Sequence, residues 1–358
     1  MSTHNYKQEL EDVIVRALAD GVSDIHLSVG HFPTFRSSGN LVPLMDTRAL
    51  TAEDTMGFVS ELLQPSFKER FLKDKEIDFS YNFYNKARFR GNAFFQKNAV
   101  GIALRAIPTQ IKTIPELNLP PILEMFSRKK QGFFLVVGPV GHGKSTTLAS
   151  MIEVMNRERS EHIVTIEDPI EHLFTESRSI IDQREAGIDT QTFHTGLQAA
   201  FRQDVDIIMI GEMRDLETMS AAVTAAETGH LVLSTLHTNN ASQTINRIID
   251  SFPGDQQSQI RVQLAGSLLG IFSQRLVPRV SGGLIPAYEL LINNTAVSSL
   301  IREGRTNEID IVIETGTKDG MIDMNRCLSD LVRKGEVTPE NALLYSFNPK
   351  GLERMFQL

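Results

Sequence analysis

Hydrophobic positions near the amino terminus recur first at the spacing of a helix and then alternate as in strands. The helical stretch covers 7–19, and its apolar positions are Leu10, Val13, Ile14, Ala17 and Leu18. Gly21 ends this helix. Strands are expected at 24–28, 34–36 and 41–44, and a hairpin signal at 37–40 joins the last two.

A second helical stretch covers 51–73, and it is followed by expected strands at 77–81, 87–95 and 101–107. Because helices and strands are mixed in this way, residues 1–108 are predicted to form a smaller α+β domain with an antiparallel sheet. A cluster of prolines predicts a linker over 109–121, and its members are Pro108, Pro115, Pro120 and Pro121.

The rest of the chain, 122–358, alternates uninterrupted apolar strands with helices. The expected strands are 133–137, 163–166, 207–210, 231–235 and 285–292, and the first is followed by a helix at 145–157. Runs of Val, Ile and Leu without polar alternation are typical of strands buried on both faces. The pattern therefore predicts an α/β domain with a parallel sheet covered by helices.

Composition and charge narrow the classes of function. The chain has 358 residues, enough for about two domains. Its net charge of −8 argues against a dedicated nucleic-acid binder. The single cysteine, Cys327, excludes an intrachain disulfide and a four-cysteine zinc site, and indicates the cytoplasm. No apolar run approaches the ~18 residues of a membrane span, so membrane association is expected only through partners.

A glycine-rich segment after the first strand of the second domain fits the pattern G-x-x-x-x-G-K-[ST]. Its residues are Gly138, Pro139, Val140, Gly141, His142, Gly143, Lys144 and Ser145, with Thr146 next in the helix. A chance match in a chain of this length has odds of roughly one per cent. The loop N–H groups and the helix dipole would hold phosphates. Lys144 would reach the β- and γ-phosphates, and Ser145 would bind Mg²⁺.

His142 stands at a variable position of this loop. We expect it to be a tolerated surface substituent, and a pH-sensitive contact with phosphate is the alternative.

Carboxylates follow two of the expected strands. Glu212 ends the apolar run 207–210 after one glycine, and Glu167, Asp168 and Glu171 follow the strand at 163–166. Hydrolysis of a nucleotide needs one acid for Mg²⁺ and another for the attacking water. Ligands of open α/β sheets bind at the carboxyl ends of strands, so these acids are expected to meet the glycine-rich loop. A solvated loop carboxylate is the alternative for each.

Two histidines bracket the strand at 231–235. His230 opens it, and His237 follows its end, where it could sense the γ-phosphate or a neighbouring subunit. A hydrogen-bonded histidine at a strand end is the alternative for both.

Together these motifs resemble the type II/IV secretion ATPases, over nearly the whole chain. The similar segments are 162–171, 211–215, 226–230, 235–238, 88–90 and 104–108. The resemblance implies a PAS-like amino-terminal domain, a RecA-like P-loop ATPase domain, and a homohexamer with ATP and Mg²⁺ between the two domains. It also implies roles for individual residues: Glu171 as catalytic base, Glu212 as the acid that helps to hold Mg²⁺, His230 and His237 in support, and Arg88, Arg90 and Arg105 facing the phosphates.

The chain departs from the family pattern at three places. His142 stands where serine is usual, Val205 stands where proline is usual, and 296–303 matches only in part an element that supports pilus retraction. The chain begins directly with the compact first domain and has one cysteine, which favours the retraction branch over the extension branch.

The resemblance thus implies a motor for type IV pilus retraction and twitching motility at the cytoplasmic side of the inner membrane. Its expected partners are an inner-membrane platform protein and other pilus motor ATPases, with no nucleic acid. The alternatives are an accessory retraction ATPase of the same branch, a RecA-like nucleic-acid translocase, and a nucleotide-binding regulator without turnover.

Overall fold

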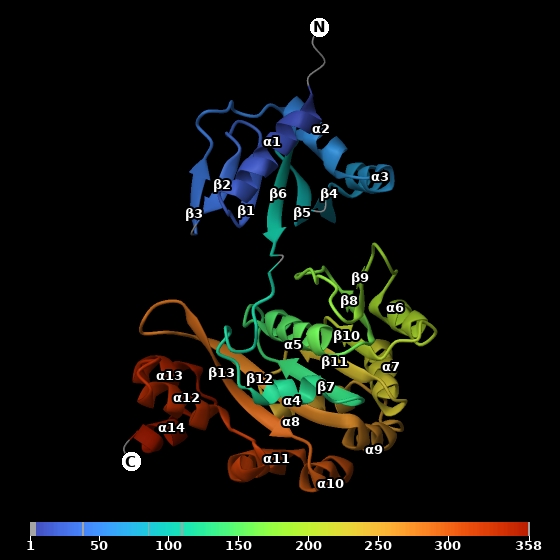
Figure 1. Ribbon diagram of the computed structural model, residues 1–358, viewed down its shortest axis with the longest axis vertical. Coiled ribbons are helices and arrows are strands. Elements are labelled where there is room, and N and C mark those ends of the chain that lie inside the picture. Colours follow the sequence, from blue (N-terminus) through green and yellow to red (C-terminus); the bar gives the residue numbers. More distant parts are fainter. Residues whose placement is uncertain (1–4, 38, 85, 109, 357–358) are drawn as a thin grey trace. The chain divides into compact units, whose positions relative to one another are not determined.

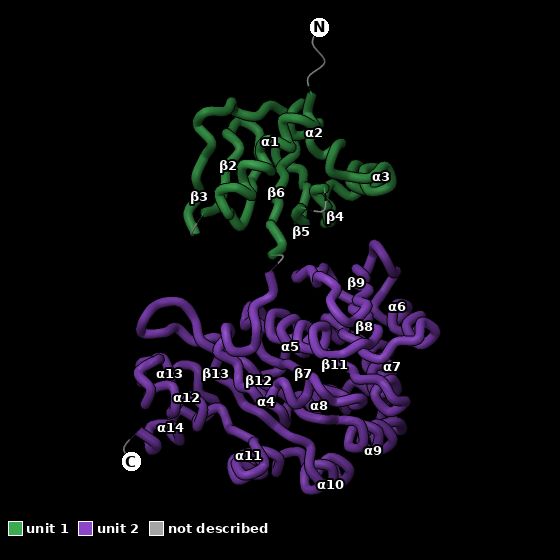
Figure 2. Tube along the Cα trace, viewed as in Figure 1, with its two compact units in different colours: residues 1–109 green, residues 110–358 purple. Residues whose placement is uncertain are grey.

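The computed structural model describes residues 5–37, 39–84, 86–108 and 110–356. The chain divides into two compact units, Met1–Thr109 and Gln110–Leu358 (Figure 2). Thr109, the first residue of the predicted linker, lies outside the described residues.

Unit 1 contains a six-stranded sheet in the order β3-β2-β1-β6-β5-β4 (Figure 1). All its neighbouring strands pair antiparallel, as predicted. The strands are β1 Asp24–Ser28, β2 Thr34–Ser37, β3 Asn40–Pro43, β4 Glu76–Phe83, β5 Ala87–Gln96 and β6 Ala99–Ile107. The predicted hairpin joins β2 to β3 with Ser37 opposite Asn40, and Ser38 lies outside the described residues.

Three helices accompany this sheet: α1 Tyr6–Ala19, α2 Ala52–Leu62 and α3 Pro65–Asp74. The stretch 51–73 is helical as predicted, but it is divided into two helices. The first begins with a capping box between Thr51 and Asp54. Pro65 then starts a new helix at its first position, where its missing N–H costs no hydrogen bond.

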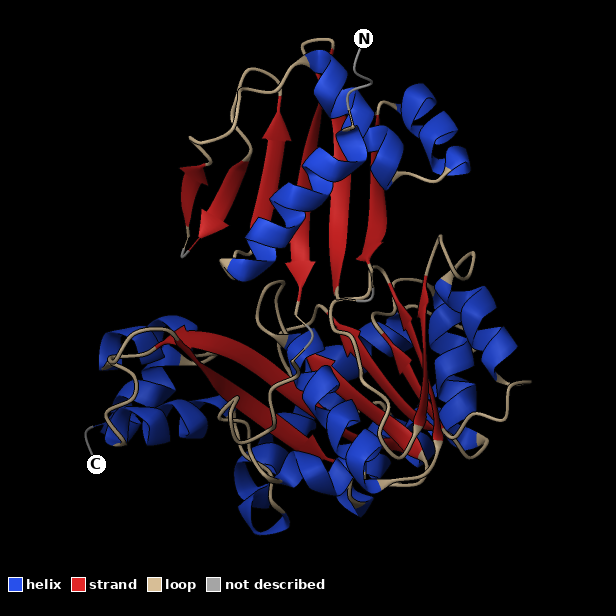
Figure 3. Ribbon diagram, turned by 45° about the horizontal axis from the view of Figure 1, so that its top comes forward, coloured by secondary structure: helices blue, strands red, loops and turns tan. Residues whose placement is uncertain are grey.

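The sheet of unit 1 has one buried and one polar face. Figure 3 shows helices lying over one face, and the core there contains Ile25, Leu104 and Phe89. On the opposite face the register aligns a row of polar residues across five strands: Arg36, Asp24, Arg105, Arg90 and Ser80. Unit 1 therefore presents charged side chains on the face of a sheet.

Unit 2 contains a seven-stranded sheet in the order β13-β12-β7-β11-β10-β8-β9. The strands are β7 Gly132–Val137, β8 His162–Glu167, β9 Ile180–Glu185, β10 Ile207–Ile210, β11 Leu231–Leu236, β12 Leu268–Pro278 and β13 Leu284–Ile292. The predicted α/β architecture is confirmed, with one correction. The sheet is parallel from β12 to β9, but β13 runs antiparallel to β12 because a short hairpin connects them.

Alternate residues of β7 enter two separate cores, one on each face of the sheet. Phe133, Leu135 and Val137 belong to the larger core, while Phe134 and Val136 belong to the core that includes residues of α4 (Ile122–Ser127) and α5 (Lys144–Glu158). Burial on both faces explains why this strand is apolar at every position from 133 to 137.

The other helices of unit 2 surround the sheet and form a small carboxy-terminal cluster (Figure 1). The α-helices are α6 Phe193–Ala200, α7 Leu216–Glu227, α8 Ala241–Asp250, α9 Gln257–Ser267, α10 Thr295–Glu303, α11 Ile309–Thr315, α12 Met324–Arg333, α13 Pro339–Tyr345 and α14 Pro349–Phe356. Two short 3₁₀ helices, η1 Thr306–Glu308 and η2 Gly316–Asp319, flank α11. Among the described residues, no helix combines the length and the hydropathy that crossing a membrane would take.

Candidate active site

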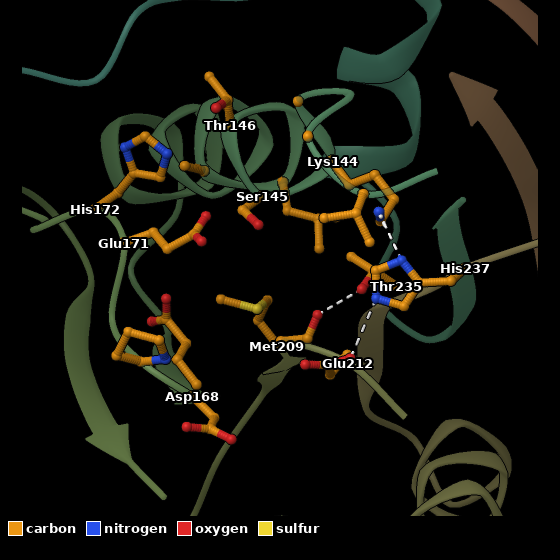
Figure 4. Close-up of a pocket in the computed structure, with 18 of the residues that line it drawn as sticks. Lys144, Ser145, Thr146, Asp168, Glu171, His172, Met209, Glu212, Thr235 and His237 are labelled. Carbon is orange, nitrogen blue, oxygen red and sulfur yellow. Dashed lines mark hydrogen bonds and ion pairs between the residues drawn. The ribbon is translucent and has the colours of Figure 1, made fainter. Parts of the chain in front are cut away.

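A cavity of about 510 Å³ lies within unit 2, at the carboxyl ends of β7, β8, β10 and β11 (Figure 4). The side of the cavity made by α5 and the loop before it includes Val140, Gly141, Gly143, Lys144, Ser145 and Thr146. The residues at and after the carboxyl ends of β8, β10 and β11 include Glu167, Asp168, Glu171, Glu212, Arg214 and His237. The structure thus places Lys144, Glu171 and Glu212 around one space.

The glycine-rich loop, residues 138–145 and called the phosphate loop below, connects β7 to α5. Gly138, Gly141 and Gly143 all have positive φ, of 144°, 77° and 78°. At Gly138 a side chain is excluded for a second reason, because an added Cβ would lie 2.3 Å from the carbonyl oxygen of Gln274. The close approach of β12 therefore requires the first glycine of the loop.

Lys144 is 7% exposed and lies at the start of α5. Its Nζ donates to the carbonyl oxygen of Pro139 at 2.9 Å and lies 3.2 Å from Nδ1 of His237. Burial lowers the pKa of Lys144, although the negative charges of Glu212 and Glu171 act against this shift. An ammonium group can only donate, so His237 accepts at Nδ1 and carries its proton on Nε2.

Glu212 lies between His237 and Arg214. The Nε2 of His237 is 3.3 Å from one carboxylate oxygen of Glu212, and the guanidinium of Arg214 donates to the other. Arg214 also lies 3.6 Å from Asp168. Burial acts to raise the pKa of Glu212, but these hydrogen bonds and the charge of Arg214 hold it below its usual range. Glu212 is therefore an ionised carboxylate beside the lysine.

Glu171 reaches the cavity from the loop after β8. Figure 4 shows its carboxylate pointing toward the hydroxyl of Ser145, with Thr146 and His172 nearby. Burial lowers the pKa of His172, so its ring is neutral at physiological pH. The charge of Glu171 also acts on Lys144, which places the two groups within electrostatic range of each other.

Glu167 is a buried carboxyl group at the end of β8. It accepts from the hydroxyl of Thr165 at 2.6 Å and from the amide of Gln183 at 3.2 Å. Burial raises the pKa of Glu167 to about 7 despite these hydrogen bonds. The negative charge of Glu171, on the loop that follows, also acts to raise the pKa of Glu167.

Two of the predicted site residues in unit 2 have other surroundings. His142 is half-buried, and its ring accepts a hydrogen bond from β12, so the prediction of a surface substituent is wrong. His230 lies at the amino end of β11, where its ring contacts the carbonyl of Ala225 at 3.1 Å and the ring of Phe201. The six residues of β11 separate it from His237, a distance of roughly 20 Å. The structure therefore does not bring His230 into the cavity.

The three predicted arginines belong to unit 1. Arg88 and Arg90 lie on β5, and Arg105 lies on β6 directly opposite Arg90. Arg105 Nε donates to Asp24 at 2.8 Å, which fixes the direction of its exposed guanidinium. Their contact with a phosphate stays a prediction.

The cavity offers oxygen ligands for a magnesium ion. Among the described residues, no group of three or more His, Cys, Asp and Glu side chains could hold a metal alone. Mg²⁺ bound with a nucleotide needs fewer protein ligands, because phosphates and water supply most of its coordination. The hydroxyl of Ser145 and the ionised carboxylate of Glu212 fit this requirement.

Two residues of the site were not identified from the sequence as parts of it, whereas Glu167 was expected there among the acids that follow the apolar run at 163–166. Arg214 follows Glu212 by two positions, which gave no sign of their pairing. Gln274 bonds both the phosphate loop and α5 from a distance of more than a hundred residues in sequence, and no local pattern indicates that contact.

Comparisons with known proteins agree with this geometry. The model of the family described as type II/IV secretion system protein matches residues 5–284. The chain is 39% identical to the type IV pilus retraction ATPase PilT of Pseudomonas aeruginosa over 334 residues, 93% of this chain and 97% of that protein. It is 38% identical to the type IV pilus ATPase PilU of the same organism, over 98% of this chain and 92% of PilU.

A solved structure gives the same result. The crystal structure of the pilus retraction motor PilT with bound ADP superimposes with a TM-score of 0.90 at 45% identity, covering 96% of this chain and 98% of that one. The resemblance inferred from the motifs is confirmed, and the chain belongs to the type II/IV secretion system protein family.

Proposed function

We propose that this protein is a Mg²⁺-dependent ATPase that hydrolyses ATP in the cavity of unit 2. The observation that carries the proposal is the meeting of Lys144, Glu171 and Glu212 around one space at the carboxyl ends of parallel strands. A phosphate-binding loop alone would support binding, whereas two separate acids beside it also support hydrolysis.

Each residue has a role that follows from its surroundings. The N–H groups of the phosphate loop and the amino end of α5 bind the phosphates. Lys144 approaches the β- and γ-phosphates, and Glu171 orients the attacking water and accepts its proton. Ser145 and Glu212 would hold Mg²⁺, which offsets negative charge on the phosphates when it is bound. The products are ADP and inorganic phosphate.

The pairing of His237 with Glu212 supports this arrangement. Because Arg214 and His237 keep Glu212 ionised, its carboxylate can accept from water that surrounds a metal ion. His237 also contacts Lys144, so it links the lysine of the phosphate loop to the acid of the neighbouring strand.

The proposed biological role is retraction of a type IV pilus, with twitching motility as its result. Its support is the similarity to the retraction ATPase PilT along almost the entire length of both chains. The proposal includes a homohexamer in the cytoplasm at the pilus base, with ATP between the two domains and Arg88, Arg90 and Arg105 facing its phosphates. An inner-membrane platform protein and other pilus motor ATPases are the proposed partners.

An accessory retraction ATPase is the second candidate, because the identity to PilU is nearly the same as the identity to PilT. The element at 296–303 bears on this choice. It forms most of α10, whose Val297 and Ile301 are buried in the core of unit 2.

Phosphate release by the purified full-length protein tests the ATPase. We expect Glu171→Gln to lower kcat at least a hundredfold with little change in nucleotide binding, because the amide cannot accept the proton of the attacking water. Lys144→Ala should abolish both binding and turnover. Glu176→Gln, an exposed carboxylate on the same loop, is the matched control. Wild-type turnover in Glu171→Gln would remove Glu171 from the mechanism.

Deletion of the gene tests the biological role. A retraction motor predicts more surface pili and no twitching, and complementation with Glu171→Gln should not restore movement. Loss of pili would instead indicate extension. An accessory ATPase predicts that overexpression of another retraction ATPase restores movement to the deletion strain.

A further inference from the structure

The strand β12 continues past the point where its neighbour β7 ends. The last paired residues are Ser273 and Val137, and the phosphate loop begins at the next residue of the chain, Gly138. Beyond Ser273, β12 stays paired with β13 on one edge. Its other edge faces the phosphate loop, as the close approach of the Gln274 carbonyl to Gly138 shows.

Two hydrogen bonds join position 142 to this free edge of β12. The side-chain amide of Gln274 donates to the carbonyl of His142 at 2.8 Å, and the backbone N–H of Leu276 donates to Nδ1 of His142 at 2.9 Å. Gln274 is 3% exposed, and its own oxygen accepts from Thr147 of α5 at 2.6 Å. The loop and the helix after it are thereby attached to the same strand.

The two hydrogen bonds differ in what they require at position 142. Any residue supplies the carbonyl that Gln274 contacts. The bond from Leu276 needs a side-chain acceptor that reaches the strand, and the imidazole provides one at Nδ1. An acceptor placed elsewhere on the side chain would not replace it.

The charge state of the ring agrees with this geometry. The groups that face it are Arg275 of β12, Lys144 of α5 and Tyr345 of α13, whose ring centroid lies 6.4 Å away. Burial and the positive charges of Arg275 and Lys144 lower the pKa of His142. The ring is therefore neutral, and its Nδ1 is free of a proton and able to accept.

We propose that His142 is a positioning residue that fixes the phosphate loop on β12 in the shape that receives a nucleotide. The expected effect of His142 on the affinity for nucleotide rests on the proposed ATPase function. The attachment itself is a property of the protein without nucleotide. Without the bond to Leu276 the loop samples other shapes, and the competent fraction falls.

Three variants separate the contribution of the hydrogen-bond acceptor at Nδ1 from that of the volume of the ring. In His142→Asn the amide oxygen lies near the place of Nδ1 and can accept from Leu276. In His142→Gln the polar group lies near the place of Nε2 and cannot, and His142→Ala removes the acceptor. His31→Gln, an exposed histidine of unit 1, is the matched control for the change of residue type.

Two measurements on the full-length protein test the inference. Amide hydrogen exchange without nucleotide should be faster at residues 138–145 in His142→Gln and His142→Ala, and near the wild-type rate in His142→Asn. The KM for ATP should rise about three- to tenfold in the first two variants, the range of one net hydrogen bond. Their kcat should change less than KM, and asparagine should restore KM.

The outcomes distinguish this inference from the proposed function. Unchanged exchange in His142→Gln and His142→Ala, or no difference between asparagine and glutamine, would overturn the positioning role while leaving an active wild-type ATPase intact. Absence of hydrolysis in the wild type would overturn the proposed function, and the exchange measurement would still decide whether His142 holds the loop.

Discussion

The two sheets of this protein carry their polar groups in different places. In β4 of unit 1 the apolar residues Ile77, Phe79 and Phe83 are buried and polar residues separate them, so one face of the sheet is open. In unit 2 every residue of β7, β10 and β11 is buried. Unit 1 can therefore present functional groups on a face, whereas the centre of unit 2 can present them only where its strands end.

The buried carboxyl groups of the two units also differ. In unit 1, Arg48 lowers the pKa of Asp54, and Arg105 lowers that of Asp24 against the effect of burial. In unit 2, burial raises the pKa of Glu167 and of Glu289 to about 7. The first pair is stabilised by arginine partners, while the second pair has neutral hydrogen-bond donors around it.

The largest expected difference between the sheets concerns packing. Ile208→Ala in β10, fully buried between two helix layers, should lower the stability of unit 2 by about 2–5 kcal/mol. Arg90→Ala, on the open face of unit 1, should change the stability of unit 1 by less than about 0.5 kcal/mol. Urea unfolding of the full chain, followed by pulsed hydrogen exchange of peptides from each unit, measures both. Equal losses of stability in the two variants would contradict the proposed difference between the two sheets.

A second expected difference is the response of unit 2 to pH. The folded-state pKa of Glu167, about 7, lies above the ordinary value of 4.5 for a glutamate side chain, because the carboxyl group is buried. Its stabilising contribution is therefore complete below about pH 4.5 and is lost as the pH rises through 7. Relative to the wild type, Glu167→Gln should become more stable by roughly 2.5 kcal/mol as the pH rises from 5 to 8, because glutamine remains neutral.

The same urea experiment at the two pH values measures this gain, with Glu176→Gln as the exposed control. A difference between Glu167→Gln and the wild type that stays constant from pH 5 to pH 8 would show that the carboxyl group is ionised throughout.

The smallest effect on stability is expected in unit 1, and its dependence on pH is opposite to that of Glu167. Asp54 closes the capping box of α2 and binds Arg48, and its folded-state pKa is lowered. Its contribution is present above about pH 4 and is lost as the pH falls through the folded-state value. Asp54→Asn should destabilise unit 1 by about 1 kcal/mol at pH 7 and by less in acid. Glu53→Gln, exposed in the same helical turn, controls for the change of charge, and an equal loss there would assign the effect to net charge alone.

The sequence predicted the central strands of the sheet of unit 2 better than the strands on either side of them. β7, β8, β10 and β11 were found because strands buried on both faces are apolar without interruption. β12 was missed because Ser273, Gln274 and Arg275 interrupt its apolar pattern. β9 was missed because it is an edge strand in which Asp182, Gln183 and Arg184 follow two isoleucines.

In the candidate site, too, some residues could be predicted from the sequence and others could not. The positions of Lys144, Glu171 and Glu212 could be expected because each follows a recognisable strand, and such strands end on the same side of the sheet. The setting of His142 could not be expected, since its partner is a backbone N–H more than a hundred residues away. His230 precedes β11 and His237 follows it, so the same rule already separates the two histidines, and only the family resemblance suggested a role for His230 in hydrolysis.

The contact between Gly138 and Gln274 has a consequence for redesign of nucleotide preference. Position 138 is constrained by a neighbouring strand before any nucleotide arrives, so a library there would mostly sample misfolded loops. Val140 lines the same cavity, is 78% exposed and has a backbone that ordinary residues adopt. A search for altered base or phosphate selectivity should begin at that side chain.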